Sequence, residues 1–245
     1  MEVSKKIVFI KNWILNYVNS MPKKAESLVI GISGGVDSSV TSTLCAMTGL
    51  KTIVLTMPIK QISSQHDLSL KHKDWLKEKF ENVESHIIKL DEVFDSFKSS
   101  LSNFDNEHGM ANSRARIRMT TLYQVAAANR GIVVGTGNKV EDFGVGFYTK
   151  YGDGGVDISP IADCAKTEVW ELGKELNILK EIIETPPTDG LWDDGRTDEG
   201  QLGLSYKELE EAMKNENSKN REKYLKIRKV NLHKMESIPV CKIPK

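Results

Sequence analysis

Short apolar runs alternate with amphipathic stretches along the first half of the chain. The apolar runs predict buried strands that begin near Ser27 and lie at 51–57, around 86–90 and at 132–136. Between them, apolar residues recur three or four positions apart, which predicts helices after the first strand, at 68–80, from Asp91 with Phe94, Phe97 and Leu101 inward, and at 110–129. Such alternation indicates a parallel sheet with helices on both faces, a doubly wound α/β fold.

The amino terminus reads as a packed helix rather than as a signal peptide. Ile7, Ile10, Ile14 and Val18 fall on one helical face, and Lys11 interrupts the apolar run. No stretch approaches the roughly 20 consecutive apolar residues that a membrane-spanning helix needs. We therefore expect no membrane partner.

The second half of the chain is less regular. Residues 142–160 are rich in glycine, a helix is expected at 166–176, and the chain from Ser205 is charged and helical as far as Pro239. Residues 185–203 hold two prolines and four glycines, with few large apolar side chains to anchor them. A long loop of this kind inside a compact domain is usually functional. We expect a lid that is mobile without ligand and closes over a bound one.

Composition narrows the class of protein. With 34 Lys and Arg against 34 Asp and Glu, the net charge is zero, so no overall field attracts nucleic acid or an anionic membrane. Cys45, Cys164 and Cys241 are odd in number and contain no Cys-x-x-Cys, which argues against a disulfide framework or a zinc knuckle. We expect a reduced, cytoplasmic protein with one α/β domain over residues 1–245, because this length sustains a large core.

The most informative segment is the turn Ser33-Gly34-Gly35-Val36-Asp37-Ser38, between the first strand and the next helix. Gly34 and Gly35 have no Cβ to obstruct an anion and can take positive φ. The amides that open the helix face the turn, beside the positive end of the helix dipole. The segment therefore predicts a polyphosphate cradle. It lacks the lysine of a Walker loop, so Asp37 is the candidate to hold Mg²⁺ against the phosphate oxygens.

This hexapeptide resembles the pyrophosphate-loop signature of the N-type ATP pyrophosphatases. The resemblance implies that ATP is a co-substrate, cleaved between its α and β phosphates, with AMP left on the other substrate. It also implies a Rossmann-like sheet of the adenine nucleotide alpha hydrolase type.

Three further segments narrow the resemblance. They are Asn112-Ser113-Arg114-Ala115-Arg116-Ile117-Arg118-Met119, Gly135-Thr136-Gly137-Asn138-Lys139-Val140-Glu141, and Phe147-Tyr148-Thr149-Lys150-Tyr151-Gly152-Asp153-Gly154-Gly155-Val156-Asp157. With the turn, they resemble the ammonia-dependent NAD synthetases over nearly the whole chain. The resemblance implies amidation of deamido-NAD by ammonia through an adenylated carboxylate, giving NAD, AMP and pyrophosphate as the last step of NAD biosynthesis. It also implies a homodimer.

The resemblance assigns a magnesium site and an ATP site. Asp37 and Glu141 are the implied Mg²⁺ contacts, although Glu141 taken alone reads as a surface acid. Lys166 is the implied phosphate contact and supplies the cation that the turn lacks. The implied ATP-binding residues are Gly31, Ile32, Ser33, Gly34, Gly35, Val36, Asp37, Ser38, Thr136, Lys166 and Thr188.

The resemblance also assigns the dinucleotide site and the catalytic residues. Asp153 is implied to lie near the reacting carboxylate and, with Lys166, to be catalytic. Arg116 is implied to hold the dinucleotide, and it points away from the face that Arg114 and Arg118 share. A guanidinium can clamp a phosphate with two parallel hydrogen bonds, which lysine cannot. The implied deamido-NAD-binding residues are Arg116, Lys150, Asp157, His233 and Lys234.

Two alternatives stay open. Another amidating or thiolating pyrophosphate-loop enzyme would share the turn, although scattered cysteines and zero net charge disfavour a tRNA-modifying thiolase. A non-catalytic adenine-nucleotide sensor would keep the cradle without the reacting groups, and Asp37, Glu141 and Lys166 argue against it. Because the first strand begins near Ser27, we expect no glutamine-hydrolysing domain, so free ammonia is the expected nitrogen source.

Overall fold

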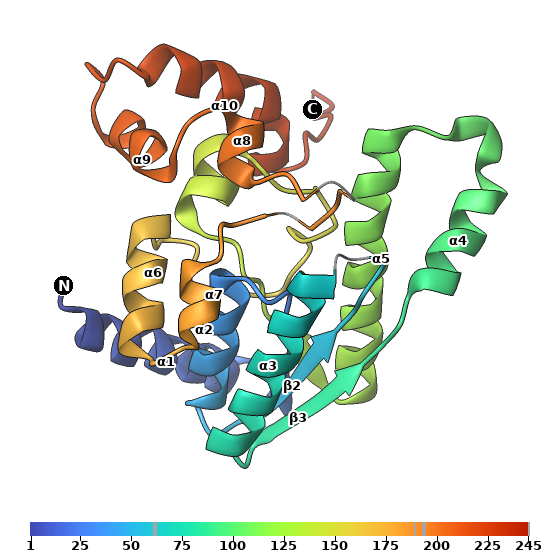
Figure 1. The fold of residues 1–245 in the computed structure, drawn as a ribbon, viewed down its shortest axis with the longest axis vertical. Helices are drawn as coiled ribbons and strands as arrows, with labels where there is room; N and C mark the ends of the chain where they lie inside the picture. The colour runs from blue at the N-terminus through green and yellow to red at the C-terminus, as the bar shows by residue number, and fades with distance from the viewer. Residues whose placement is uncertain (61–62, 189, 193–194, 245) are drawn as a thin grey trace.

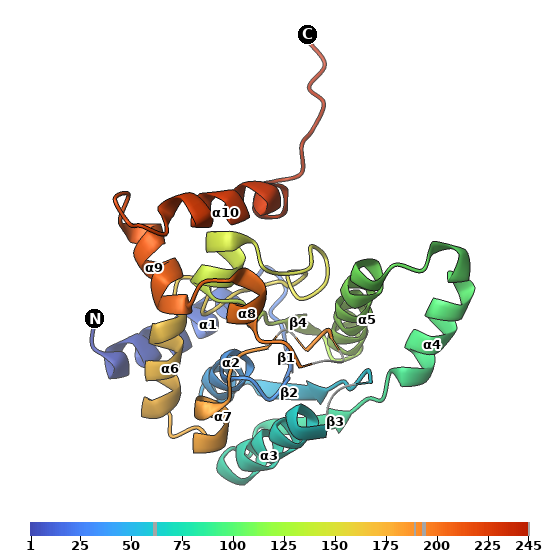
Figure 2. The ribbon, with the colours of Figure 1, turned by 45° about the horizontal axis from the view of Figure 1, so that its top comes forward.

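The computed structural model describes residues 1–60, 63–188, 190–192 and 195–244. Within these residues, one parallel sheet is formed by β1 (Ser27–Gly31), β2 (Lys51–Thr56), β3 (Val83–Ile87) and β4 (Gly131–Val133). The strands lie in the order β3-β2-β1-β4; β2 and β3 are labelled in Figure 1, and all four strands in Figure 2. The chain therefore winds from β1 to one edge and returns to place β4 on the other side of β1, which confirms the predicted doubly wound parallel sheet.

Helices cover both faces of the sheet (Figure 2). One face carries α1 (Val3–Ser20), α2 (Val36–Ala46), α3 (Ser63–Lys79), α6 (Lys166–Glu175) and α7 (Lys180–Glu184). The other carries α5 (Glu107–Ala128), with α4 (Asp91–Ser100) packed on it and η1 (Ser102–Phe104) between them.

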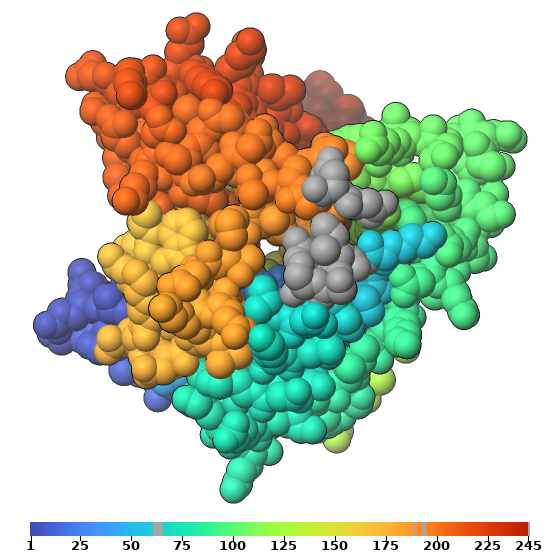
Figure 3. All heavy atoms as spheres, in the orientation of Figure 1, coloured from blue at the N-terminus to red at the C-terminus, as the bar shows by residue number. Residues whose placement is uncertain are grey.

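A group of C-terminal elements lies beyond the carboxyl ends of the strands (Figure 1). They are the π-helical turn η2 (Lys139–Val145), α8 (Asp198–Leu202), α9 (Tyr206–Lys214) and α10 (Arg221–Met235). In the space-filling view of Figure 3, the orange segment that precedes α9 lies between the teal α3 and the red C-terminal helices. This segment contains the predicted lid, of which residues 189, 193 and 194 lie outside the described part of the chain.

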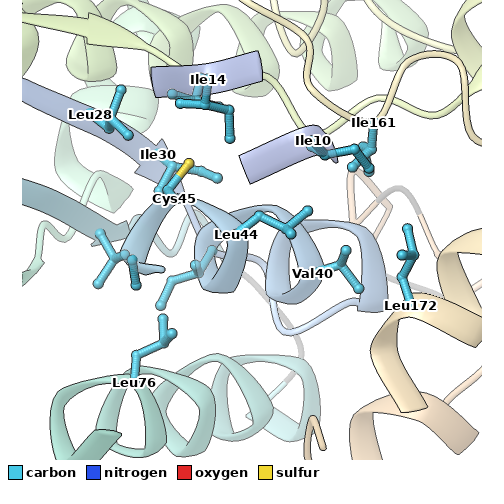
Figure 4. Packing of buried hydrophobic residues seen from close by; sticks show 14 of the residues in the cluster. Ile10, Ile14, Leu28, Ile30, Val40, Leu44, Cys45, Leu76, Ile161 and Leu172 are labelled. Atoms are coloured by element: carbon cyan, nitrogen blue, oxygen red, sulfur yellow. The ribbon is translucent and has the colours of Figure 1, made fainter. Parts of the chain in front are cut away.

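The main core forms around α2. Figure 4 shows Val40 and Leu44 of this helix among side chains from α1, α6 and the strand that carries Leu28 and Ile30. The predicted inner face of α1, with Ile7, Ile10, Ile14 and Val18, is buried as expected.

Despite its many hydroxyl groups, α2 is almost wholly buried. Its Ser and Thr side chains donate hydrogen bonds to carbonyls of the preceding turn, as Thr41 does to Asp37 O (2.9 Å) and Thr43 to Ser39 O (2.7 Å). The polar atoms are therefore satisfied inside the helix, and its small side chains let neighbouring elements approach closely. This fixes the helix whose N-terminus carries the phosphate turn.

Several boundaries differ from the sequence predictions. β3 begins at Val83 instead of near His86, because Val83 already pairs with Thr52. After Ile87 the chain continues beside the end of β2, where Ile88 N donates to Thr56 O (2.9 Å) and Leu90 N to Pro58 O (3.1 Å). Phe97 is exposed on α4, whereas the pattern placed it inward; only Phe94 is fully buried there. The helix predicted from Met110 starts one turn earlier, where the Asn106 side chain accepts a hydrogen bond from Gly109 N (2.8 Å).

Two chain-wide features complete the fold. Cys45 and Cys164 are buried, Cys241 is exposed, and all three thiols are free. Within the described ranges, no helix combines the length and the apolar character that crossing a bilayer requires.

Candidate active site

The phosphate turn is held in shape by its own serines. Gly34 has a φ of +91°, which glycine adopts at little cost, and Gly35 is the N-cap of α2. Ser33 Oγ accepts a hydrogen bond from Gly35 N (3.2 Å), and Ser38 Oγ donates one to Gly35 O (3.0 Å). The two hydroxyl oxygens lie 3.1 Å apart. The shape of the cradle therefore comes from hydrogen bonds within the turn itself, with the N-terminal amides of α2 beside it.

Lys166 brings together two carboxylates that follow different strands of the sheet. Its Nζ lies 2.5 Å from Asp37 Oδ2 and 2.9 Å from Glu141 Oε1. Asp37 is in the first turn of α2, which follows β1, and Glu141 is in η2, which follows β4. Because β1 and β4 are neighbours, the two carboxylates meet at the predicted edge of the sheet. The Lys166 side chain is only 2% exposed, so this is a buried ionic cluster.

Burial and charge oppose each other in this cluster. Burial alone would lower the pKa of Lys166, but the adjacent Asp37 and Glu141 raise it, so the ammonium stays charged. Burial raises the pKa of Asp37, and Lys166 offsets this only in part. Burial also acts to raise the pKa of Glu141, yet Lys166 and the Tyr206 hydroxyl together hold it below its usual value. Because one cation faces two carboxylates, the cluster keeps an excess of negative charge that a further cation could neutralise.

Two residues that sequence reasoning missed hold these carboxylates. Asn138 Nδ2 donates to Asp37 Oδ1 (3.0 Å), while its Oδ1 accepts from the amides of Val140 and Glu141 (3.0 and 3.1 Å). The Tyr206 hydroxyl donates to Glu141 Oε1 (2.6 Å). The spacing Asn-x-x-Glu resembles an N-cap signature and could have pointed to Asn138. Nothing local in the sequence points to Tyr206.

A cavity of about 390 Å³ opens along these groups at the carboxyl ends of the strands. Its walls include every residue of the predicted ATP site: Gly31, Ile32, Ser33, Gly34, Gly35, Val36, Asp37, Ser38, Thr136, Lys166 and Thr188. They also include apolar side chains that the sequence did not single out, namely Met57, Leu122 and Val156. An apolar slot beside an amide-rich turn suits a planar base joined to phosphates.

The glycine-rich run adds two more carboxyl groups to the cavity. Asp153 Oδ1 accepts a hydrogen bond from Thr149 N (2.9 Å), and the protein crowded around it raises its pKa to about 6, although Asp153 keeps exposed surface. Asp142, which the sequence did not single out, has its pKa raised well above the usual value by burial and by Asp153. A Cβ on Gly137 would lie 1.8 Å from Asp142 Oδ2, so only glycine leaves room for this carboxyl.

Most of the predicted dinucleotide residues form a chain of contacts. Arg116 donates from Nε and Nη2 to Lys150 O (3.3 Å each), and Lys150 Nζ donates to His233 O (2.8 Å). Arg116, Lys150 and His233 lie outside the walls of the cavity, whereas Lys234 is part of them. Lys234 Nζ donates to Gly146 O (2.8 Å) and to the carbonyl of Tyr148 (2.9 Å). We call Arg116, Lys150, His233 and Lys234 the basic strip.

Asp157 is held separately from the basic strip. Its carboxylate accepts hydrogen bonds from Val133 N (2.7 Å) and from the Tyr123 hydroxyl (3.1 Å). It therefore ties the glycine-rich run to β4 and α5, and it lies outside the cavity walls. These contacts give Asp157 a structural role that the sequence did not suggest.

The predicted lid has more anchors than its composition indicated. It ends in α8, where Leu202 and Asp198 are buried, and Asp198 Oδ2 accepts a hydrogen bond from the Tyr206 hydroxyl (3.0 Å). Trp192 stacks on His108 of α5 with ring centroids 6.5 Å apart. The segment is thus anchored at Trp192 and at α8, and Thr188, which precedes both, lies in the cavity wall.

The donor set of the cluster suits a hard cation. Among the residues the structure describes, no group of three or more His, Cys, Asp and Glu is placed to hold a metal ion. Asp37 and Glu141 offer carboxylate oxygens, and Lys166 already takes the part of a cation between them. A Mg²⁺ bound by one or two carboxylates normally completes its shell with water and substrate phosphates, which the adjacent turn is shaped to receive.

Comparison with known proteins agrees with this arrangement. Residues 6–242 match the NAD synthase family. The chain belongs to this family. It is 35% identical to the NH3-dependent NAD⁺ synthetase of Methanosarcina acetivorans over 237 residues, which cover 93% of this chain and 90% of the relative. The protein is therefore an ATP-dependent ligase of NAD synthesis, and the alternatives of a thiolating enzyme and of a non-catalytic sensor are excluded.

Two solved synthetase structures share the fold. An NMN synthetase from Francisella tularensis superposes with a TM-score of 0.91 at 31% identity, covering 99% of this chain and all of that one. An NH3-dependent NAD synthetase from Campylobacter jejuni superposes with a TM-score of 0.79 at 26% identity, again over 99% of this chain and the whole of the other.

Proposed function

We propose that this protein converts deamido-NAD, ATP and ammonia into NAD, AMP and pyrophosphate through an adenylated carboxylate. One observation carries the proposal: the phosphate turn, the Asp37–Lys166–Glu141 cluster and the glycine-rich run with Asp153 line the same cavity. Adenylation of a carboxylate requires a cradle for the phosphates, groups that neutralise their charge, and a binding surface for the second substrate. We take residues 1–245 as one catalytic domain.

ATP would bind with its phosphates on the turn and its base over the sheet. The triphosphate would lie on Ser33–Ser38, where α2 offers its N-terminal amides, and Lys166 would neutralise part of its charge. The base would enter the apolar slot that contains Met57 and Leu122. Thr136 and Thr188 face the same space and would contact the nucleotide from the strand end and from the lid.

Mg²⁺ would be held by Asp37 and Glu141. The fit rests on three features of the cluster: its oxygen donors, its excess of negative charge, and the ammonium of Lys166 that stands between the two carboxylates. When bound, the ion would screen the phosphates and make pyrophosphate a better leaving group. Asn138 and Tyr206 would keep the two carboxylates aimed at it.

Deamido-NAD would approach from the side of the basic strip. Arg116, Lys150, His233 and Lys234 would bind its phosphates and ribose, and Asp157 would shape the loop that the dinucleotide touches. Arg116, Lys150 and Lys234 donate to backbone carbonyls, and His233 lies exposed, so all four can exchange partners at little cost. Because the strip lies at the surface, we propose that a second copy of the chain completes this site in a homodimer.

The proposed reaction has two steps, in which pyrophosphate and then AMP are the leaving groups. A carboxylate oxygen of the substrate attacks the α-phosphorus of ATP, and pyrophosphate departs onto the turn. Ammonia then attacks the adenylated carbonyl, AMP departs, and one proton is released as the amide forms. Asp153 would lie beside the reacting carbonyl, while Lys166 and the amides of the turn stabilise charge that develops on the phosphates. The three free thiols fit a reducing, cytoplasmic setting.

The test is the product balance of the purified protein. With deamido-NAD, ATP, Mg²⁺ and ammonium, we expect NAD, AMP and pyrophosphate in equal amounts. Release of ADP and phosphate, or AMP without NAD, would contradict the proposal. Replacement of ammonium by glutamine should abolish turnover, because the proposed nitrogen source is free ammonia.

A second candidate substrate is the acid form of NMN. The high structural similarity to the Francisella NMN synthetase favours it, and a mononucleotide would not need the outer part of the basic strip. The ratio of kcat/KM for the mononucleotide acid and for deamido-NAD decides between them. A ratio well above one assigns the protein to NMN synthesis, and a ratio well below one keeps the dinucleotide.

A further inference from the structure

We propose that Tyr206 is a positioning residue for Glu141 and couples this carboxylate to α8, the final part of the lid. The inference rests on the proposed function, because it takes Glu141 as a ligand of the magnesium ion. Tyr206 lies in α9, an element that no sequence motif connected with the active site.

The hydroxyl of Tyr206 serves two carboxylates. It lies 2.6 Å from Glu141 Oε1 and 3.0 Å from Asp198 Oδ2. Lys166 Nζ also donates to Glu141 Oε1, so two donors converge on one oxygen and restrict rotation of the carboxylate. A phenol has one proton to give, so the bonds to Glu141 and to Asp198 depend on each other. A shift of α8 would therefore change how firmly Glu141 is held.

The ring of Tyr206 is fixed on all sides. Tyr206 is 1% exposed and meets the Trp170 ring edge-on, with centroids 5.7 Å apart. Lys166 Nζ lies 4.9 Å from the centre of the ring. Tyr206 N donates to Glu199 Oε1 (2.8 Å), which gives a second tie to α8. A side chain locked in this way places its hydroxyl accurately, as the support of a metal ligand requires.

The start of α9 is itself well anchored. Ser205 and Glu208 form a capping box at its N-terminus, with Ser205 N donating to Glu208 Oε2 (2.9 Å). One turn after Tyr206, Glu210 accepts hydrogen bonds from Thr167 N and from the Thr167 hydroxyl (2.9 and 2.7 Å), next to Lys166 in the chain. The same helix therefore supports Glu141 and the segment that carries Lys166.

The first experiment measures metal binding without turnover. Mn²⁺ replaces Mg²⁺, and an ATP analogue with a methylene group between the α and β phosphates prevents cleavage. For Tyr206→Phe we expect the Mn²⁺ dissociation constant, measured by electron paramagnetic resonance, to rise about tenfold, the usual cost of losing support for a metal ligand. Tyr224→Phe is the matched control, because Tyr224 is buried in the same small core but lies in α10, whereas the hydroxyl bonded to Glu141 is that of Tyr206 in α9. An unchanged constant for Tyr206→Phe overturns the inference.

A double-mutant cycle tests whether Tyr206 acts through Glu141. In the Glu141→Gln background, Tyr206→Phe should weaken Mn²⁺ binding by less than about twofold, because the group that it positions is already altered. Equal effects of Tyr206→Phe in both backgrounds would mean that Tyr206 stabilises the fold generally, which contradicts the inference.

Hydrogen exchange tests the link to the lid. In the nucleotide complex, amides of Asp198–Leu202 should exchange faster in Tyr206→Phe than in the wild type, whereas Tyr224→Phe should leave them unchanged. If Tyr206→Phe does not fold, Asp198→Asn replaces it, since the amide keeps the shape and removes the charge of the acceptor. Faster exchange in α8 together with a changed Mn²⁺ constant supports the coupling, and no change in either overturns it.

The outcome is separable from the proposed function. A wild-type protein that makes no NAD contradicts the proposed reaction. The Mn²⁺ constants and the exchange rates require no turnover, so they still decide the role of Tyr206.

Discussion

The ionic cluster and the basic strip are both made of charged residues, yet they are built in opposite ways. In the cluster, Lys166 is buried and bonded to the side chains of Asp37 and Glu141, which Asn138 and Tyr206 hold in turn. In the strip, Arg116 and Lys150 donate to backbone carbonyls near the surface. The charges of the cluster are therefore paired with one another inside the protein, whereas the basic side chains of the strip are available to bind an anion.

The difference follows from the cost of burying charge. A buried ion needs its partners permanently, because an unpaired one would cost several kcal/mol. An exposed guanidinium loses little when it leaves a carbonyl for a phosphate. We infer that the cluster sets stability and rate together, while the strip sets substrate affinity alone.

The largest effect is expected for Lys166→Met. It leaves Asp37 and Glu141 without their cation, and breaking a buried pair from one side costs about 3–5 kcal/mol. Denaturant unfolding should show this loss of free energy, along with loss of turnover. The matched control is Lys139→Met, whose partner Asp163 is exposed, so that it should cost less than about 1 kcal/mol. Equal losses for the two variants would show that the cluster adds nothing to stability.

Asp37→Asn and Glu141→Gln should each lower turnover by about a hundredfold or more. Each removes a carboxylate that the proposed Mg²⁺ needs, and metal stabilisation of the transition state is usually worth several kcal/mol. The Mg²⁺ concentration for half-maximal rate should rise in both variants. Asp163→Asn should behave as wild type. Wild-type rates for Glu141→Gln across a magnesium titration would show that Glu141 does not hold the ion.

Arg116→Lys should raise KM for the dinucleotide about tenfold, close to 1.4 kcal/mol, because lysine cannot make the paired hydrogen bonds of a guanidinium. The kcat and the melting temperature should stay as in wild type, since the present partner of Arg116 is only the carbonyl of Lys150. Arg130→Lys, at an exposed pair with Glu26, is the control. A fall in melting temperature with unchanged KM would mean that Arg116 stabilises the fold and does not bind the dinucleotide.

The lid should become better protected when ATP and dinucleotide bind together. We expect the largest gain in hydrogen-exchange protection around Thr188, and a smaller gain in α8, which Leu202 and Asp198 already anchor. Closure would keep water from the adenylated carboxylate, where hydrolysis would waste ATP. Equally strong protection with and without ligands would make residues 185–203 a fixed loop.

The smallest effect concerns Asp153 and pH. Its pKa is raised from 3.8 in the unfolded chain to about 6, so its ionisation destabilises the fold. The loss of folding stability from this ionisation is absent below about pH 4. It grows between about pH 4 and 6 and reaches its full size above about pH 6. Asp153→Asn should therefore gain melting temperature relative to wild type between pH 4.5 and 7, by no more than about 2–4 °C, because solvent reaches the carboxylate. A difference that does not vary with pH would contradict this assignment.

Sequence reasoning found the parts of this site that lie within single motifs. The hexapeptide at Ser33–Ser38 contains its own glycines and hydroxyls, so its geometry is local and was predictable. The alternation of strands and helices likewise gave the parallel sheet. The edge strand β3 was misplaced, because its own residues are mostly polar or partly exposed, whereas the apolar Ile88 and Leu90 follow it.

The sequence alone determined the cradle, the fold class and the family, because each depends on residues close together or on a repeating pattern. Only the tertiary structure decided that Lys166 lies between Asp37 and Glu141, since this depends on β4 returning beside β1. It also decided the roles of Tyr206 and Asp198, which come from helices outside the sheet. The physical reason is the same in both cases. Buried charges and hydroxyls bond to whichever groups the fold brings close to them, and no local sequence pattern specifies which groups those are.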